Sequence, residues 1–152
     1  MSPVPDAHTD ARVLETLRAH DEREAAILAS YRRLVEETSD EGIRYLGRLI
    51  IEDETRHHAL ITEMAHRVEG WEHHEDATDA TPSLTPRVDP ALLAETRRLI
   101  ALEKADAKEL RRLQKELRYA PATSLLPLLV KIMLADTKRH IEILQLIRAY
   151  AG

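Results

Sequence analysis

The 152-residue chain contains no cysteine and no phenylalanine, and it has only four glycines. The absence of cysteine excludes disulfide bonds, thiol catalysis, iron–sulfur clusters and cysteine-ligated zinc. The shortage of glycine, together with an abundance of Ala, Leu, Glu and Arg, favours long helices over sheet. Apolar residues make up 43% and charged residues 32% of the chain, which is the balance of a globular domain rather than a disordered one.

Long apolar and basic segments are also missing. The longest apolar run, residues 125–135, is interrupted by Pro127 and Lys131 and is far shorter than the roughly 20 residues that span a bilayer. The N-terminal segment is polar and lacks the apolar core of a secretion signal. The net charge is −5, and no basic stripe with interleaved aromatic residues is present. We therefore expect a cytoplasmic protein that binds neither membranes nor nucleic acids.

Apolar periodicity predicts four helices, at about residues 10–37, 40–69, 90–119 and 124–150. Residues 1–9 are expected to form a flexible N-terminal tail, and residues 10–152 a single domain. The predicted helix ends coincide with capping and breaking signals. These signals are Thr38 with Glu41, Gly70, Asp89 with Pro90, and Thr123 or Ser124 shortly before Pro127.

The segment between the second and third helices shows no periodicity and is rich in Thr, Pro, Asp and Ser. A link of about 20 residues reaches roughly 60 Å at about 3.3 Å per residue. The reach of the link therefore exceeds the length of a 30-residue helix, which is about 45 Å. Such a link can cross the whole bundle and make the second and third helices parallel. We predict an all-α four-helix bundle in which two helical hairpins are joined by a long crossover.

The two predicted hairpins resemble each other in sequence. Residues 24–34 match residues 103–113 without a gap, and residues 53–57 and 136–140 share Asp, Arg and His at the same places. This similarity favours an internal duplication and a pseudo-twofold bundle. A chance likeness between two helical surface patterns is the competing explanation.

Acidic residues interrupt the apolar stripe of every predicted helix. A buried carboxylate without a partner is very costly, so four of them together require a cation or basic partners. The inward residues are Glu24 on the first helix, Glu54 and His57 on the second, Glu103 on the third, and Asp136 and His140 on the fourth.

The positions of the turns predict which of these residues meet. Glu24 and Glu54 are each 15 residues from Ser39, so they lie at the same height in an antiparallel hairpin. Glu103 matches Asp136 in height if the second turn is centred at 119–120, and His140 if it is centred at 121–122. With the middle helices parallel, all these side chains converge near mid-bundle. Oxygen and imidazole ligands without sulfur suit iron or manganese, and zinc is possible.

This pattern resembles the ferritin-like, rubrerythrin-type family of di-iron carboxylate proteins. In that family two helices each contribute one Glu, and the other two each contribute a Glu-x-x-His. Glu24 and Glu103 match the single glutamates, and the segment from Glu54 to His57 matches one Glu-x-x-His. Tyr31 lies seven residues after Glu24, where a family tyrosine can hydrogen-bond the site. The resemblance covers residues 12–150.

The resemblance implies a ferritin-like four-helix bundle that binds iron, two per chain in a complete site, or manganese, and no haem. It implies oxidation of Fe(II) or reduction of dioxygen or peroxide. Because the chain has no rubredoxin-like cysteine module, any electron donor must be external. We also expect a homo-oligomer, and we assign no separate catalytic residue. The implied roles are terminal ligands for Glu24 and Glu103, bridging ligands for Glu54 and Asp136, and one imidazole per metal from His57 and His140.

The fourth helix departs from the family pattern. Asp136 stands where the family has Glu, Arg139 stands where it has His, and His140 comes one residue late. Residues four apart still share a helix face, but Asp is shorter than Glu and bridges two metals less easily. Asp53 and His57 repeat the same spacing, so the register of the second helix is ambiguous. A site with one metal, or with none, stays open.

A metal-free interpretation depends on Arg139, which either extends into solvent or neutralises Asp136 and Glu103. In the second case a salt-bridge network replaces the metal, and the bundle serves as an interaction or structural module. Several single residues near the predicted site also have a second interpretation. Glu22 is a rival to Glu24 as the inward acid. Three histidines are expected outside the site: His58 on its flank, His20 at the polar edge and His66 in solvent. His73 and His74, beside Trp71, could bind a metal ion of their own.

Overall fold

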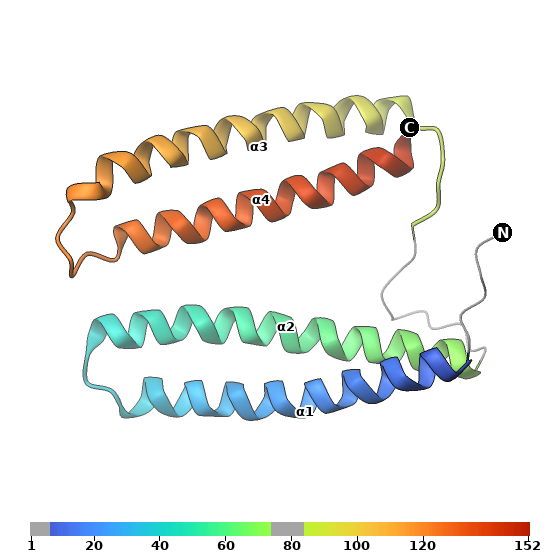
Figure 1. Cartoon of the computed structure of the whole chain (residues 1–152), viewed down its shortest axis with the longest axis horizontal. Helices are drawn as coiled ribbons and strands as arrows, with labels where there is room; N and C mark the ends of the chain where they lie inside the picture. The colour runs from blue at the N-terminus through green and yellow to red at the C-terminus, as the bar shows by residue number, and fades with distance from the viewer. Residues whose placement is uncertain (1–6, 74–83) are drawn as a thin grey trace. The chain divides into compact units, whose positions relative to one another are not determined.

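A computed structural model describes residues 7–73 and 84–152, which are helical apart from short connections and contain no strand (Figure 1). Helix α1 spans Ala7–Glu37, α2 Glu41–His73, α3 Pro90–Glu116 and α4 Leu126–Ala151, with a short 3-10 helix η1 at Leu117–Tyr119. Helix α1 packs against α2, and α3 packs against α4, so the chain forms two helical hairpins in two compact units. The predicted all-α class and the two hairpins are confirmed. The single four-helix domain stays a prediction.

The first hairpin differs from the sequence expectation at two helix starts. Helix α1 already includes residues 7–9, which were predicted to belong to the tail, and residues 1–6 lie outside the described residues. Helix α2 is capped by Asp40, whose Oδ1 accepts a hydrogen bond of 2.9 Å from Ile43 N. Thr38 Oγ1 instead accepts one of 3.2 Å from Asp40 N. The charged carboxylate of Asp40 suits the positive end of the helix dipole better than the neutral hydroxyl of Thr38.

The glycines of α2 have roles other than the predicted C-cap. Helix α2 continues through Gly70 to His73, so the expected end at Gly70 is wrong. One interior glycine costs only about 1 kcal/mol relative to alanine, which a long packed helix tolerates. Gly47 lies near the turn of the hairpin, where a Cβ atom would come within 2.6 Å of Val35 Cγ2. Gly47 therefore permits the close approach of α1 and α2.

The start of α3 agrees with the sequence expectation. Asp89 is the N-cap, its Oδ1 accepts a hydrogen bond of 3.0 Å from Leu92 N, and Pro90 occupies the first helical turn. The residues just before α3 are fixed to the end of α4. The backbone N–H groups of Arg87 and Asp89 donate to the carbonyl oxygens of Tyr150 and Ala151 at 3.0 and 3.1 Å. The second hairpin is thus closed at the end opposite its turn.

Helix α4 begins slightly later than expected. Its N-cap is Leu125, which makes no capping bond with its side chain, so the cap predicted at Thr123 or Ser124 is wrong. Ser124 Oγ still accepts a long hydrogen bond of 3.4 Å from Leu126 N. Pro127 lies in the first turn as predicted, where its missing N–H group has no helical partner to lose.

The two hairpins bury equivalent positions. Leu17 and Leu28 of α1 are buried, and so are Thr96 and Ala107, which hold the matching places on α3. This agreement in burial supports the internal duplication seen in the sequence. Large apolar side chains stay exposed on both hairpins, among them Ile27, Leu34, Ile50, Leu102, Leu128 and Met133.

Within the described residues, no helix combines the length and the hydropathy of a membrane span.

Candidate metal centre

The first hairpin brings three potential metal ligands together. One donor atom each of Glu24, Glu54 and His57 lies within 4.8 Å of the other two. A metal with bonds of about 2.1 Å holds its ligands at most about 4.2 Å apart, so small side-chain rotations bring the three onto one ion. Glu24 comes from α1, and the other two come from α2. The equal distance of Glu24 and Glu54 from the turn therefore predicted correctly that they meet.

Glu24 is the member of this group that bears most directly on metal binding, because its carboxyl group is buried. Its side chain is only 9% exposed, whereas that of Glu22 faces solvent, so Glu24 is the inward acid. Its Oε1 lies 2.9 Å from Nε2 of His20. Its Oε2 is buried and has no hydrogen-bond partner among the described residues. An unpartnered carboxylate oxygen in such a place is costly, and a bound cation removes that cost. The residues present thus fit a metal ion.

The other two ligands leave one side of the group accessible. Glu54 is half-buried and His57 is exposed. An ion held here is shielded by α1 on the Glu24 side and open to solvent, or to a small molecule, on the His57 side. Tyr31 is half-buried, and its hydroxyl forms no hydrogen bond among the described residues, so the structure does not show the expected hydrogen bond between this tyrosine and the site.

A second polar cluster lies between α1 and α2 and was missed in the sequence. Nδ1 of His58 lies 3.2 Å from Oδ1 of Asp21, and Thr62 Oγ1 donates a hydrogen bond of 3.1 Å to the same oxygen. His58 is half-buried, and its Nδ1 lies within ion-pair distance of Asp21 without forming a hydrogen bond among the described residues. Asp21 and His58 are nearly equidistant from the turn. The argument that residues equally far from the turn lie at the same height, which paired Glu24 with Glu54, would therefore have paired them as well.

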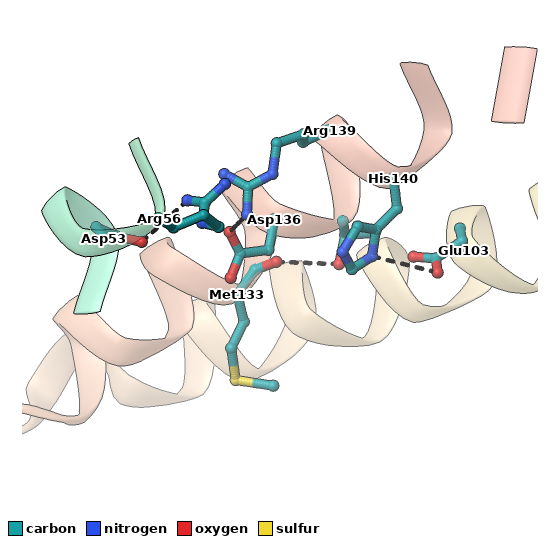
Figure 2. A network of polar contacts seen from close by, with 8 residues as sticks. Asp53, Arg56, Glu103, Met133, Asp136, Arg139 and His140 are labelled. Carbon is teal, nitrogen blue, oxygen red and sulfur yellow. Dashed lines mark hydrogen bonds and ion pairs between the residues drawn. The ribbon is translucent and has the colours of Figure 1, made fainter. Parts of the chain in front are cut away.

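In the second hairpin the acids predicted to point inward contact an imidazole and a guanidinium group (Figure 2). Oε1 of Glu103 lies 3.4 Å from Nδ1 of His140, as expected for a turn centred at 121–122. Oδ1 of Asp136 lies 2.5 Å from Nη2 of Arg139. Arg139 thus contacts Asp136, while Glu103 contacts His140. Among the described residues, no third metal-ligating side chain joins Glu103 and His140.

The ion pairs define which residues of the two hairpins are equivalent. Asp53 pairs with Arg56 at 3.0 Å, as Asp136 pairs with Arg139, and Figure 2 shows both pairs. Asp136 is therefore the counterpart of Asp53, and the next residue, Thr137, stands where the first hairpin has Glu54.

Thr137 does not replace the missing carboxylate. It is buried, and its hydroxyl has two acceptors for its one proton, the Met133 carbonyl at 3.0 Å and Asp106 Oδ2 at 3.3 Å. The bridging role expected for Asp136 stays a prediction, and it requires Asp136 to leave Arg139.

One of the other histidines singled out in the sequence contacts a residue of the group. His66 is exposed, as expected. His73 is part of α2, and His74 falls outside the described residues together with the proposed pairing of the two. The one that contacts the group is His20, which was expected as a polar edge residue; its side chain is 42% exposed and also contacts Glu24.

In comparisons with protein families, curated proteins and solved structures, the chain matches none of them. The metal preference of the site is therefore inferred from the chemistry of its own ligand atoms. Two carboxylates and a neutral imidazole form an oxygen-rich set without sulfur, which suits Fe(II) and Mn(II) and also accepts zinc.

Proposed function

We propose that this chain is a ferritin-like, non-haem metal protein that binds iron, or manganese, and oxidises Fe(II) or reduces dioxygen or peroxide. One observation carries the proposal. Glu24 is buried with an unpartnered oxygen, and donors of Glu54 and His57 lie within 4.8 Å of its own. The two carboxylates offset the charge of a divalent cation, and the imidazole adds a ligand of intermediate softness.

The protein groups in this proposal hold and shield the ion. Glu24 anchors it from the buried side, next to Leu28, which is buried one turn further along α1. Glu54 and His57 would hold it from α2, and one coordination position would remain for an oxidant. Bound iron supplies the electrons that reduce dioxygen or peroxide, and an external donor restores the reduced state.

We further propose that the two hairpins pack as a ferritin-like four-helix bundle with α2 and α3 parallel. The length of the link permits this connectivity, and the exposed apolar side chains on both hairpins need a cover. In this arrangement Glu103, Asp136 and His140 offer a second metal position.

The test is metal content followed by turnover. After expression with iron or manganese, elemental analysis should find between one and two metals per chain. The metal-free chain, loaded with Fe(II) without oxygen and then exposed to oxygen, should form ferric iron faster than the buffer alone. The matched control is the double variant Glu24→Gln/His57→Gln, which should lose both properties. Equal oxidation rates for the variant and the parent would refute the proposal.

A second candidate function is that of a metal-free bundle acting as an interaction or structural module. It is favoured by the second hairpin, where Arg139 contacts Asp136 and His140 contacts Glu103, so these acids already have protein partners. Protein that stays metal-free after expression with both metals would support this candidate over the first.

A further inference from the structure

His20 lies one turn before Glu24 on α1, at a distance that suits a ligand of the same ion. Its Nε2 is 2.9 Å from Glu24 Oε1. Two ligands of one metal, with bonds of about 2.1 Å at a right angle, are about 3.0 Å apart. The same two atoms can thus share a hydrogen bond in the metal-free chain and become adjacent ligands when an ion binds. In the metal-free chain His20 is close to Glu24 but does not belong to the group of donor atoms that lie within 4.8 Å of one another. Its ring must therefore turn towards Glu54 and His57, and the side chain is 42% exposed, which leaves it room to do so.

The comparison of the two hairpins sets His20 apart from a chance surface histidine. Glu24 has Glu103 as its counterpart, and His57 has His140. The position of His20 is taken by Leu99 in the second hairpin, and that of Glu54 by Thr137. Both differences place the metal-ligating residue in the first hairpin. The hairpin with the extra ligands is also the one whose buried carboxylate oxygen has no partner.

We propose that His20 is the fourth protein ligand of a single-metal site that is complete within the first hairpin. His20 and Glu24 bind from α1, and Glu54 and His57 bind from α2. This inference rests on the proposed function, because it concerns the same centre, and it adds that the first ion needs no residue of the second hairpin. Two carboxylates neutralise a divalent cation, and four protein donors leave one or two positions of a five- or six-coordinate ion open for water or an oxidant.

The experiment uses the full-length, metal-free chain and Mn(II) at less than one equivalent. Pulsed EPR counts the imidazole nitrogens bound to Mn(II), and calorimetry measures the dissociation constant. The parent should show two nitrogens. The variant His20→Leu, which introduces the residue type of Leu99, should show one nitrogen and bind Mn(II) about 10 to 100 times more weakly. His57→Gln should also show one nitrogen.

Two further variants control the interpretation. His66→Gln alters an exposed histidine of α2 and should leave two nitrogens and the same affinity. The double variant Glu103→Gln/His140→Gln should also leave the first ion unchanged, because the second hairpin does not contribute to it. His20→Gln keeps a polar side chain at this position. It should also show one nitrogen, and it tests whether the effect of His20→Leu comes from loss of the imidazole or from altered packing of the leucine.

The possible failures are distinguishable. One nitrogen in the parent, with no change in either His20 variant, would overturn the assignment of His20 while leaving the proposed metal function intact. A first ion that weakens in the Glu103→Gln/His140→Gln variant would overturn the claim that one hairpin suffices. A parent chain that binds no Mn(II) and no Fe(II) would overturn the proposed function itself.

Discussion

At the scale of single residues, Glu24 combines a cost in stability with a role in the proposed metal binding. Its buried, unpartnered oxygen destabilises the metal-free fold, so Glu24→Gln should raise the melting temperature of the metal-free protein. The expected rise is on the order of 2–4 °C for each kcal/mol recovered. Added Mn(II) should stabilise the parent by mass action but not the variant. Thermal melting with and without Mn(II) checks both effects.

The matched control for that variant is Glu22→Gln, which alters an exposed acid two residues away. It should change neither the melting temperature nor the response to Mn(II). If Glu24→Gln lowered the stability of the metal-free chain, Glu24 would have a satisfied structural role, and the reason for placing a cation beside it would disappear.

The exposure of Arg139 predicts a small energetic role for its ion pair. The side chains of Arg139 and Asp136 are 46% and 40% exposed, so water screens their attraction. Arg139→Ala should cost less than about 1 kcal/mol in the free energy of unfolding, as measured by chemical denaturation at neutral pH. Arg56→Ala breaks the equivalent pair of the first hairpin and should behave alike. A loss of about 3–5 kcal/mol for Arg139→Ala alone would mean that it balances buried acids.

At the scale of helices, Gly47 tests how closely α1 and α2 approach. An alanine here gains about 1 kcal/mol of helix propensity, but its Cβ would lie 2.6 Å from Val35 Cγ2. Valine is stiff at χ1 and yields little, so Gly47→Ala should lower the melting temperature. The double variant Val35→Ala/Gly47→Ala removes the clash and should be more stable than Val35→Ala alone. A Gly47→Ala variant that melts higher than the parent would contradict this packing.

The helices were predictable because their apolar stripes repeat over many turns, whereas their ends depend on single side chains. Thr38 and Asp40 both have residue types that suit an N-cap. The sequence does not show whether the hydroxyl of Thr38 or the carboxylate of Asp40 accepts hydrogen bonds from the free N–H groups of the first helical turn. Gly70 has the residue type of a C-cap but lies inside α2, because helix formation on both sides of it outweighs its cost. Local preference thus locates a boundary only within a few residues.

The candidate site was partly predictable for a geometric reason. Equal distance from the first turn brought Glu24 to Glu54. The same reasoning left Glu103 opposite either Asp136 or His140, because the sequence did not fix the centre of the second turn, and the structure pairs it with His140. The register of α4 was not predictable in this way, because Asp136 and Thr137 both lie near the inner face. The Asp136–Arg139 ion pair, which repeats Asp53–Arg56, is needed to recognise Thr137 as the counterpart of Glu54.

At the scale of the whole chain, the two hairpins are similar in sequence and burial but unequal in chemistry. In the second hairpin Asp136 contacts Arg139 and Glu103 contacts His140. In the first hairpin one carboxylate oxygen of Glu24 is buried without a hydrogen-bond partner among the described residues. If both hairpins derive from one ancestor, the residues proposed to bind metal are concentrated in the first, and the acids of the second have protein partners. The helical architecture is therefore common to both halves, and the proposed function depends on what differs between them.

The central claim is that a metal ion binds between Glu24, Glu54 and His57. The most direct measurement is anomalous X-ray diffraction from crystals of the full-length protein grown with Mn(II) or, without oxygen, with Fe(II). We predict an anomalous peak bonded to carboxylate oxygens of Glu24 and Glu54 and to a nitrogen of His57. The claim would be contradicted by crystals in which this position is empty and Glu24 Oε2 is satisfied by a protein cation instead.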